Sequence, residues 1–225
     1  MQPDITNTST ANVPLNLMVV GTEGNSGIWS PVFDKWGNLG NVGGWTLKMI
    51  TKDPAGKVYC VGTEGNVGIW NGSSWENKGN MGGWTLKMLV WDSKGDLWGV
   101  GTEGNTGKWD DKNKKWNNLG NLGGWTLKML AFDTKGTMWG VGTEGNVGTW
   151  IDKDNKWNRL GNLGGWTLKM LAFNKEIIKK DDKQTVVETM WCVGTESNVG
   201  CWDGVTSWDN RGYIGGWTMN WLYFL

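Results

Sequence analysis

An internal repeat constrains the fold of this chain more than any other feature of its sequence. The segment Gly-Asn-Leu-Gly-Gly-Trp-Thr-Leu-Lys-Met begins at Gly161, and close copies carry their Gly-Gly-Trp from Gly43, Gly82, Gly123 and Gly215. A second segment, Gly-Thr-Glu-Gly-Asn, keeps step with it from Gly21, Gly62, Gly101 and Gly142, and returns as Gly-Thr-Glu-Ser-Asn from Gly194. Such a fixed period is typical of a solenoid, a propeller or another repeat array.

The spacing of the repeat defines the domain organisation. Successive Gly-Thr-Glu segments begin 41 residues apart (21 to 62), then 39, 41 and 52 apart. The last interval is longer because it contains a Lys- and Asp-rich insertion over residues 174–188, and insertions of this kind fall in loops. We therefore expect one domain over residues 15–225, with 174–188 as a solvated loop insertion, and a polar extension over residues 1–14.

Each repeat contains four short β-competent stretches separated by polar turns. In one copy these are Trp125–Phe132, Met138–Thr143, Val147–Ile151 and Lys156–Leu160. A period of ~40 residues with four antiparallel strands predicts an all-β fold, a five-bladed β-propeller. The chain begins at a second strand, 15–22, and ends on a lone first strand, 217–224, so the two ends are expected to share one blade and close the ring.

Composition excludes several classes of function. The 22 basic and 22 acidic residues cancel, which argues against binding to a nucleic-acid backbone. The chain has no His, no nucleophile or phosphate-loop motif and only three Cys, so we expect no enzyme activity, no cofactor and no metal. No apolar run reaches the ~18 residues of a membrane helix, and residues 1–14 lack a secretory leader. We expect a monomer without membrane insertion, cytoplasmic or exported by a non-standard route.

Two repeated loops are expected at the same rim of the propeller. In a four-stranded meander, the connection into the first strand and the turn between the second and third strands lie at the same end. The Gly-Gly-Trp and Gly-Thr-Glu-Gly-Asn segments would therefore open onto one rim. The turns at the other end, such as 71–74 and 110–114, differ between repeats. Because the repeats agree at one rim and diverge at the other, we interpret the first as the functional rim.

The candidate binding residues are the polar and aromatic side chains of this rim. The turn carboxylates are Glu23, Glu64, Glu103, Glu144 and Glu196. The turn amides are Asn25, Asn66, Asn105, Asn146 and Asn198, and the loop amides are Asn41, Asn80, Asn121 and Asn162. The aromatic residues are Trp45, Trp84, Trp125, Trp166 and Trp217. Acceptors, amides and a flat aromatic surface together suit a neutral sugar.

Each residue type also has a purely structural interpretation. The turn Asn residues can serve turn geometry alone, and each Trp can belong to the core as the first residue of an inner strand. The Glu residues can pair with the repeated Lys48, Lys87, Lys128 and Lys169, although the blade that the two chain ends share carries Asn220 at that position. A calcium role is weaker, because each turn offers a single carboxylate.

The pattern Gly-Gly-Trp-x-x-Lys-Met-Leu-x-Phe-x-x-x-Gly-x-x-Trp-Gly-Val resembles the repeat of tachylectin-2-like lectins. The resemblance covers nearly all of the chain after about residue 15. It implies a five-bladed propeller with sugar sites between adjacent blades, specific for N-acetylglucosamine or N-acetylgalactosamine. The chain differs from the family pattern in its longer Gly-Thr-Glu-Gly-Asn-Val-Gly turn, and its repeats vary at Ser197 and Tyr213.

The sequence leaves two functions open. The first is a multivalent lectin that binds glycans through five repeated sites, because blades that agree suit many copies of one small ligand. The second is a protein-interaction scaffold without sugar binding, because propellers also serve as rigid docking rings and the fold does not decide the function.

Overall fold

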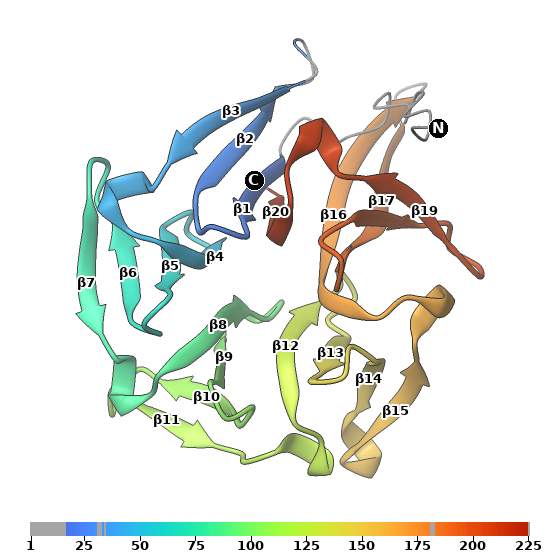
Figure 1. Ribbon diagram of the computed structural model, residues 1–225. Helices are drawn as coiled ribbons and strands as arrows, with labels where there is room; N and C mark the ends of the chain where they lie inside the picture. The colour runs from blue at the N-terminus through green and yellow to red at the C-terminus, as the bar shows by residue number, and fades with distance from the viewer. Residues whose placement is uncertain (1–16, 31–32, 34, 181–182, 225) are drawn as a thin grey trace.

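The computed structural model describes residues 17–30, 33, 35–180 and 183–224, so the expected extension over residues 1–14 lies outside it. Within these residues, five four-stranded antiparallel sheets stand round a central axis (Figure 1). The inner strands of neighbouring sheets contact one another all the way round the ring. The chain is a five-bladed β-propeller, as the repeat predicts.

The strands of each blade follow one another outwards from the axis. Blade 1 contains β20 (Met219–Phe224), β1 (Leu17–Gly21), β2 (Ser26–Ser30) and β3 (Lys35–Gly40). Blade 2 contains β4 (Leu47–Lys52), β5 (Val58–Gly62), β6 (Val67–Trp70) and β7 (Trp75–Gly79). Blade 3 contains β8 (Leu86–Trp91), β9 (Leu97–Gly101), β10 (Thr106–Asp110) and β11 (Lys115–Asn118). Blade 4 contains β12 (Leu127–Phe132), β13 (Met138–Gly142), β14 (Val147–Ile151) and β15 (Lys156–Gly161). Blade 5 contains β16 (Leu168–Lys180), β17 (Lys183–Gly194), β18 (Val199–Trp202) and β19 (Trp208–Gly212).

Blade 1 is assembled from both ends of the chain. Strand β20 pairs antiparallel with β1, with Leu17 opposite Phe224 and Val19 opposite Leu222. This pairing confirms the predicted closure. It matters physically because the hydrogen-bonding edges that an open array would expose are instead paired within one sheet.

A short 3-10 turn leads into each inner strand. These turns are η1 (Val42–Gly44), η2 (Met81–Gly83), η3 (Leu122–Gly124), η5 (Leu163–Gly165) and η6 (Ile214–Gly216). A sixth, η4 (Asp152–Asp154), connects β14 to β15. Because of these turns the inner strands begin two residues later than predicted, at Leu127 and not at Trp125. In the described residues, no helix has the length and apolarity needed to cross a bilayer.

The insertion over residues 174–188 forms a β-hairpin. It continues the pairing of β16 with β17, with Asn174 opposite Thr189 and Lys180 opposite Lys183. These two strands are 13 and 12 residues long, about twice the length of their counterparts in other blades. The insertion therefore lengthens one hairpin of blade 5 and leaves the ring of inner strands intact.

A buried tryptophan in each blade binds the outer strand to the 3-10 turn that enters the inner strand of the same blade. Trp75 of β7 is 8% exposed and donates its indole N–H to the carbonyl of Val42, at 2.7 Å. The same bond recurs at 2.7 Å in every blade, from Trp36, Trp116, Trp157 and Trp208. A Cβ at Gly43, where φ is +60°, would lie 2.7 Å from the Trp75 ring. Glycine is needed here both for the backbone conformation and for this contact.

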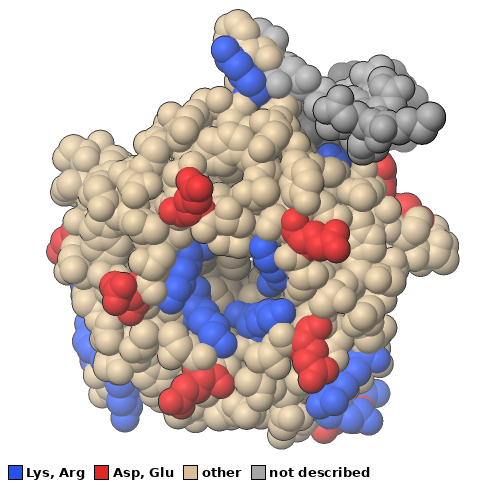
Figure 2. Space-filling view, viewed as in Figure 1, with Lys and Arg blue, Asp and Glu red and all other residues tan. Residues whose placement is uncertain are grey.

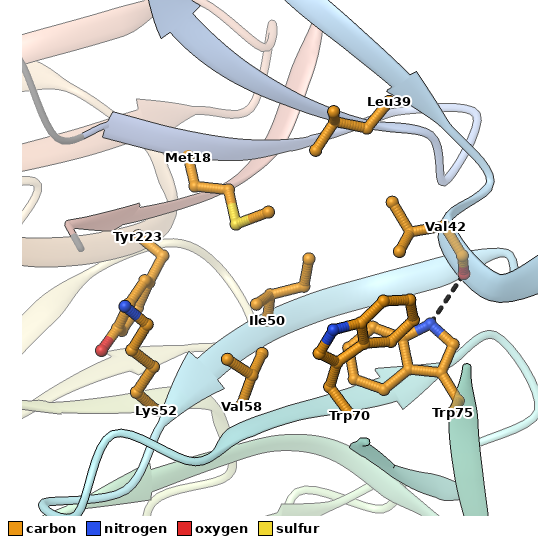
Figure 3. Close-up of a pocket in the computed structure, with 9 residues that line it drawn as sticks. All are labelled: Met18, Leu39, Val42, Ile50, Lys52, Val58, Trp70, Trp75 and Tyr223. Atoms are coloured by element: carbon orange, nitrogen blue, oxygen red, sulfur yellow. Dashed lines mark hydrogen bonds between the residues drawn. The ribbon is translucent and has the colours of Figure 1, made fainter. Parts of the chain in front are cut away.

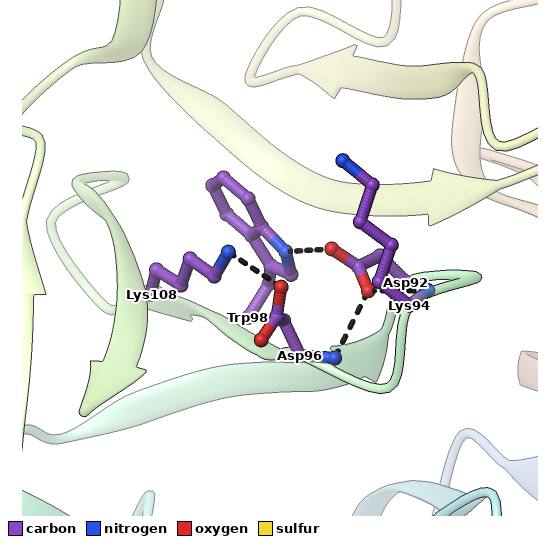
Figure 4. A network of polar contacts seen from close by, with 5 residues as sticks. All are labelled: Asp92, Lys94, Asp96, Trp98 and Lys108. Carbon is purple, nitrogen blue, oxygen red and sulfur yellow. Dashed lines mark hydrogen bonds and ion pairs between the residues drawn. The ribbon is translucent and has the colours of Figure 1, made fainter. Parts of the chain in front are cut away.

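At the opposite end of the blades, aspartates organise the turns between first and second strands. In blade 3, Asp92 accepts hydrogen bonds from the backbone N–H of Lys94 and Asp96, both at 2.9 Å, and from the Trp98 indole at 3.0 Å (Figure 4). Asp96 in turn forms an ion pair with Lys108 at 2.6 Å. Asp133 and Trp139 repeat the indole contact in blade 4 at 3.1 Å. Each of these contacts lies within a single blade and ties the turn to the strands beside it.

The three cysteines are unbridged. Cys60 and Cys192 are fully buried, and Cys201 is half-buried. Burial raises the pKa of the Cys60 thiol to about 12 and also raises the pKa of Cys192. Both behave as small apolar residues of the core.

Candidate functional site

The two repeated loops meet at one rim. We call the Gly-Thr-Glu-Gly-Asn segment of a blade its Glu turn, and the 3-10 turn with the following Trp and Thr its Trp turn. In blade 2, the backbone N–H of Thr63 in the Glu turn donates to the carbonyl of Thr46 in the Trp turn, at 3.0 Å. Equivalent bonds join the two turns of the other blades, at 2.9–3.1 Å. The two turns of one blade together form what we call a rim corner.

Each Trp turn also contacts the Glu turn of the preceding blade. The N–H of Leu47, in blade 2, donates to the carbonyl of Gly24, in blade 1, at 3.0 Å. The bond recurs at each junction and is longest, 3.5 Å, between Met219 and Ser197. Each Trp turn, with the residue that follows it, is therefore bonded to two Glu turns, that of its own blade and that of the preceding blade. These bonds join the five rim corners into a continuous belt.

In four of the blades, the second glycine of the Glu turn accommodates this close approach. Gly24 has φ of +79°, and a Cβ there would lie 2.3 Å from the Thr46 methyl group. Blade 5 carries Ser197 at this position and keeps the positive φ, at 70°. Its hydroxyl accepts a hydrogen bond from Lys169 at 2.6 Å, so this corner differs chemically from the other four.

The five Glu side chains of the rim are exposed. Figure 2 shows acidic groups spaced round a central hollow that contains basic groups. Among the described residues, none of Glu23, Glu64, Glu103, Glu144 and Glu196 has an ion pair within 4.0 Å. The alternative interpretation, in which these carboxylates form salt bridges with the repeated lysines, therefore does not hold for the described residues. The carboxylates face solvent and can accept hydrogen bonds from a ligand.

The turn amides serve the turn itself. Asn25, Asn66, Asn105, Asn146 and Asn198 are half-buried. The Asn25 side-chain oxygen lies against Gly21, where a Cβ would approach it to 2.4 Å, and the same contact recurs in all five blades. The Asn25 carbonyl also accepts the N–H of Gly21 at 2.8 Å. The structural interpretation of these residues thus accounts for most of their contacts.

The loop amides reach towards the corner. Asn41, Asn80, Asn121 and Asn162 are exposed, and each donates to the hydroxyl of its Trp-turn threonine at 3.2–3.5 Å. Blade 1 has Tyr213 instead, whose hydroxyl donates to the carbonyl of Glu196 at 3.2 Å. There the threonine hydroxyl of Thr218 pairs with that of Thr22 at 2.9 Å.

The Trp-turn tryptophans pack into the blades and keep an edge at the rim. Trp45 lies against Gly62 and Gly68 of its own blade, where added Cβ atoms would touch its ring at 3.2–3.3 Å. Four of these tryptophans are half-buried, whereas Trp125 is only 7% exposed. The guanidinium of Arg159 lies 5.3 Å from the centre of the Trp125 ring. Their main contacts are those of core residues, and Trp125 offers a ligand the least surface.

A polar depression of about 240 Å³ opens at the rim corner of blade 5. Its lining consists of Gly165, Trp166, Thr167, Gly194, Thr195, Glu196 and Asn198. Every one of these residues belongs to blade 5, although the resemblance implied sites between adjacent blades. The volume is below the ~300–1,000 Å³ of drug-sized pockets, so the depression has room only for a small ligand.

Sequence reasoning missed the threonines of the rim. Thr167 and Thr195 line the depression, and their counterparts recur beside every Gly-Gly-Trp and in every Gly-Thr-Glu. The signal was present in the sequence, because these threonines keep the same register in all five copies. Only the meeting of the two turns shows that the two hydroxyls share a corner.

A larger, apolar cavity of about 320 Å³ lies between blades 1 and 2 (Figure 3). Met18, Ile50, Lys52, Trp70 and Tyr223 are among its walls. No rim Glu or turn Asn lines it. It is separate from the candidate site.

Comparison with known proteins supports the fold. No protein-family model matches the chain, and no curated protein matches it. A solved structure described as "The de novo evolutionary emergence of a symmetrical protein is shaped by folding constraints" is 17% identical, with a TM-score of 0.60, and the match covers 92% of this chain and 97% of that one. At this identity the likeness shows the fold alone.

More distant matches include proteins of other sizes. "YCF48 bound to D1 peptide" is 15% identical with a TM-score of 0.46, over 88% of this chain and 64% of that one. The extracellular domain of the putative one component system BT4673 from B. thetaiotaomicron is 13% identical with a TM-score of 0.45, over 90% of this chain and 33% of that one. This chain therefore spans less than two thirds of both.

Proposed function

We propose that this protein is a multivalent lectin that binds N-acetylated sugars, N-acetylglucosamine or N-acetylgalactosamine, at the five rim corners. The observation that carries the proposal is the fivefold repetition of one corner in which an exposed Glu stands beside two threonine hydroxyls and the edge of a Trp. In blade 5 these are Glu196, Thr167, Thr195 and Trp166, and they line one depression.

The chemistry of the corner matches that of a sugar. Sugar hydroxyls donate to a carboxylate, which accepts through two oxygens, and exchange hydrogen bonds with hydroxyl and amide groups. The C–H face of a sugar ring packs on the flat face of an aromatic side chain, and Trp166 lines the depression of blade 5. The choice of an N-acetylated sugar rests on the resemblance to tachylectin-2-like lectins in the Gly-Gly-Trp repeat.

Repetition compensates for the small size of each corner. A shallow site for one sugar binds with Kd near millimolar, about −4 kcal/mol. Five such sites on one face raise the avidity for a clustered glycan surface by ~100-fold or more without a stronger individual contact. This is the functional reason we assign to five nearly identical corners.

The protein binds its sugars without converting them. Glycoside hydrolysis uses two carboxyl groups in unlike environments, one of them with a raised pKa. Each rim corner offers one exposed carboxylate, and the five are equivalent by the repeat. This arrangement favours reversible binding.

Calorimetric titration with N-acetylglucosamine and N-acetylgalactosamine tests the proposal. Binding is expected with about five equivalent sites, and Glu196→Gln is expected to remove about one of them while the fold is kept. Glu76→Gln, at an exposed position of the outer strand β7, is the matched control and leaves the stoichiometry unchanged.

A broader set of ligands decides against the alternative. Failure to bind any N-acetylated, O-methylated or sialylated sugar on a glycan array would overturn the proposal. Recovery of one stoichiometric protein partner, insensitive to free sugar, would favour the docking scaffold instead.

A further inference from the structure

Four lysines stand at one equivalent position round the central channel. They are Lys48 of β4, Lys87 of β8, Lys128 of β12 and Lys169 of β16, and β20 has Asn220 in their place. Each follows a fully buried Leu and precedes a buried Met, whereas the lysine itself is half-buried. Figure 2 shows basic side chains gathered in the hollow at the centre of the ring.

Each of these lysines is the extra residue of a β-bulge. The pairing of β12 with β13 shifts register between Leu127 and Met129, so Lys128 has no partner on the neighbouring strand. The same shift occurs at Lys48, Lys87 and Lys169, and in β20 at Asn220. A bulge redirects the side chain of its extra residue, and bulges are frequent beside functional sites.

The lysines lie close enough for their positive charges to repel one another. Burial lowers the pKa of all four ammonium groups. Lys48 and Lys128 lower the pKa of Lys87 further, and Lys128 does the same to Lys169. Among the described residues, Glu64 is the one acidic group that raises the pKa of a ring lysine, Lys48, and its effect is weaker than that of burial.

Among the described residues, no carboxylate pairs directly with a lysine of this ring. In the described part of the chain, none of the four forms an ion pair within 4.0 Å. Lys169 donates to Ser197 Oγ at 2.6 Å and to Asn220 Oδ1 at 3.3 Å, both neutral groups. Converging like charges in a partly dehydrated channel are unfavourable unless an opposite charge joins them.

We propose that these four lysines form an anion site on the channel axis, which takes a small multivalent oxyanion such as a phosphate, a sulfate or a polycarboxylate. Lysine ammonium groups bind such ligands as point charges, with three donors each on a flexible stem. A hollow lined by one sign of charge also concentrates the opposite ion. Asn220 completes the ring with a neutral amide.

The surrounding rim limits the size of the ligand. The five exposed glutamates encircle the lysines, so a long polyanion that crossed the rim would meet repulsion. A compact anion enters the hollow without reaching them. The site is also separate from the rim depression of blade 5, whose lining includes no lysine.

The test is titration with inorganic phosphate and pyrophosphate, followed by calorimetry and by thermal unfolding at constant ionic strength with chloride as the reference. Saturable binding of one anion per chain is expected, with a rise in Tm that chloride does not give. Lys128→Asn and Lys87→Asn are each expected to weaken binding about tenfold, or about 1.4 kcal/mol.

Controls separate this site from other effects. Lys112→Asn removes an exposed lysine from the far turn of blade 3 and is expected to bind as the wild type does. Asn is the residue that blade 1 carries at this position, as Asn220, and Lys87→Gln provides a second neutral side chain if one variant does not fold. Identical Tm shifts with phosphate and chloride, or wild-type affinity in both Lys→Asn variants, would overturn the proposal. Sugar titration of the same variants distinguishes its failure from failure of the lectin proposal.

Discussion

Met18 and Lys52 face the same cavity at the junction between blades 1 and 2 (Figure 3). Every other junction has a pair of aromatic rings at these positions: Tyr59 with Trp91, Trp98 with Phe132, Trp139 with Phe173 and Trp191 with Phe224, with centroids 4.7–6.0 Å apart. The missing rings leave a cavity of about 320 Å³. The junction between blades 1 and 2 therefore lacks an aromatic contact that the other four junctions have.

Filling this cavity should stabilise the protein. We expect Met18→Trp combined with Lys52→Phe to raise the free energy of unfolding, because an aromatic pair contributes about 0.5–1.5 kcal/mol beyond its buried area. For a chain of this size the Tm should rise by about 2–4 °C per kcal/mol. Calorimetric unfolding of both variants and of the double variant measures the effect. The exposed Lys94→Phe is the control, and a lower Tm in the double variant would contradict the expectation.

Trp125 should contribute more to stability than to binding. Truncation by Trp125→Ala is expected to cost about 3–5 kcal/mol, because this side chain is 7% exposed and leaves a cavity behind. Urea unfolding measures the loss. Trp109→Ala, at a half-buried position of β10, should cost clearly less. Equal costs in the two variants would mean that Trp125 is not a core residue.

The second glycine of the Glu turn, which follows the Glu, should not tolerate a larger side chain without loss of stability. Gly145 has φ of +83°, and a Cβ there would lie 2.4 Å from the Thr167 methyl group and 2.8 Å from the Leu168 nitrogen. Gly145→Ala is expected to lower the free energy of unfolding by at least about 1–2 kcal/mol, because the left-handed conformation costs this much for a residue with a Cβ. Gly72→Ala, at a positive φ with open space around it, separates the conformational cost from the clash. Denaturant unfolding should rank Gly145→Ala as the more damaging change.

The lysine ring should make stability depend on alkaline pH. The folded-state pKa of each lysine lies below its usual value of 10.5, so the unfolded chain binds more protons as pH rises through the interval between the two pKa values. The ring therefore contributes a rise of stability with pH in that interval. Tyr59, Tyr223 and Cys60 have raised pKa values and act in the opposite direction at high pH.

Comparison of variants isolates this contribution. Profiles of Tm against pH for the wild type and for Lys128→Asn share the tyrosine and cysteine effects. Their difference should be largest below the lysine pKa, with Lys128→Asn the more stable in the absence of multivalent anions, and should shrink as pH rises. A difference that does not change with pH would contradict the assigned charge repulsion.

Much of the fold could be predicted because, in four of the five blades, each strand pairs with its neighbour in the sequence within one repeat. The predicted strand Val147–Ile151 has the observed bounds, and 138–143 and 156–160 differ from the observed strands by one residue. Periodicity also predicted that β20 and β1 would share a blade. The start of the inner strand was placed too early, at Trp125, because the 3-10 turn before it has no distinct apolar pattern.

The location of the candidate site could be predicted from the sequence, but the contacts between its residues could not. The alternation of strand directions was enough to bring the Glu turns and Trp turns to one rim. Sequence spacing did not show that Thr195 and Thr167 meet, nor that the depression of blade 5 is lined within a single blade. The two threonines lie in different turns, and the distance between them depends on how the strands of the blade twist and pack.

The sequence by itself determined the number of blades, their strands and the rim at which the repeated side chains gather, because these follow from a local pattern copied five times. The tertiary structure decided which charges remain without a partner. Lys87 and Lys128 are far apart in the sequence, and each sits in an equivalent strand, so nothing local brings them together. Closure of the ring placed them round one axis, where each occupies the same bulge of its inner strand and the charge of Lys128 lowers the pKa of Lys87.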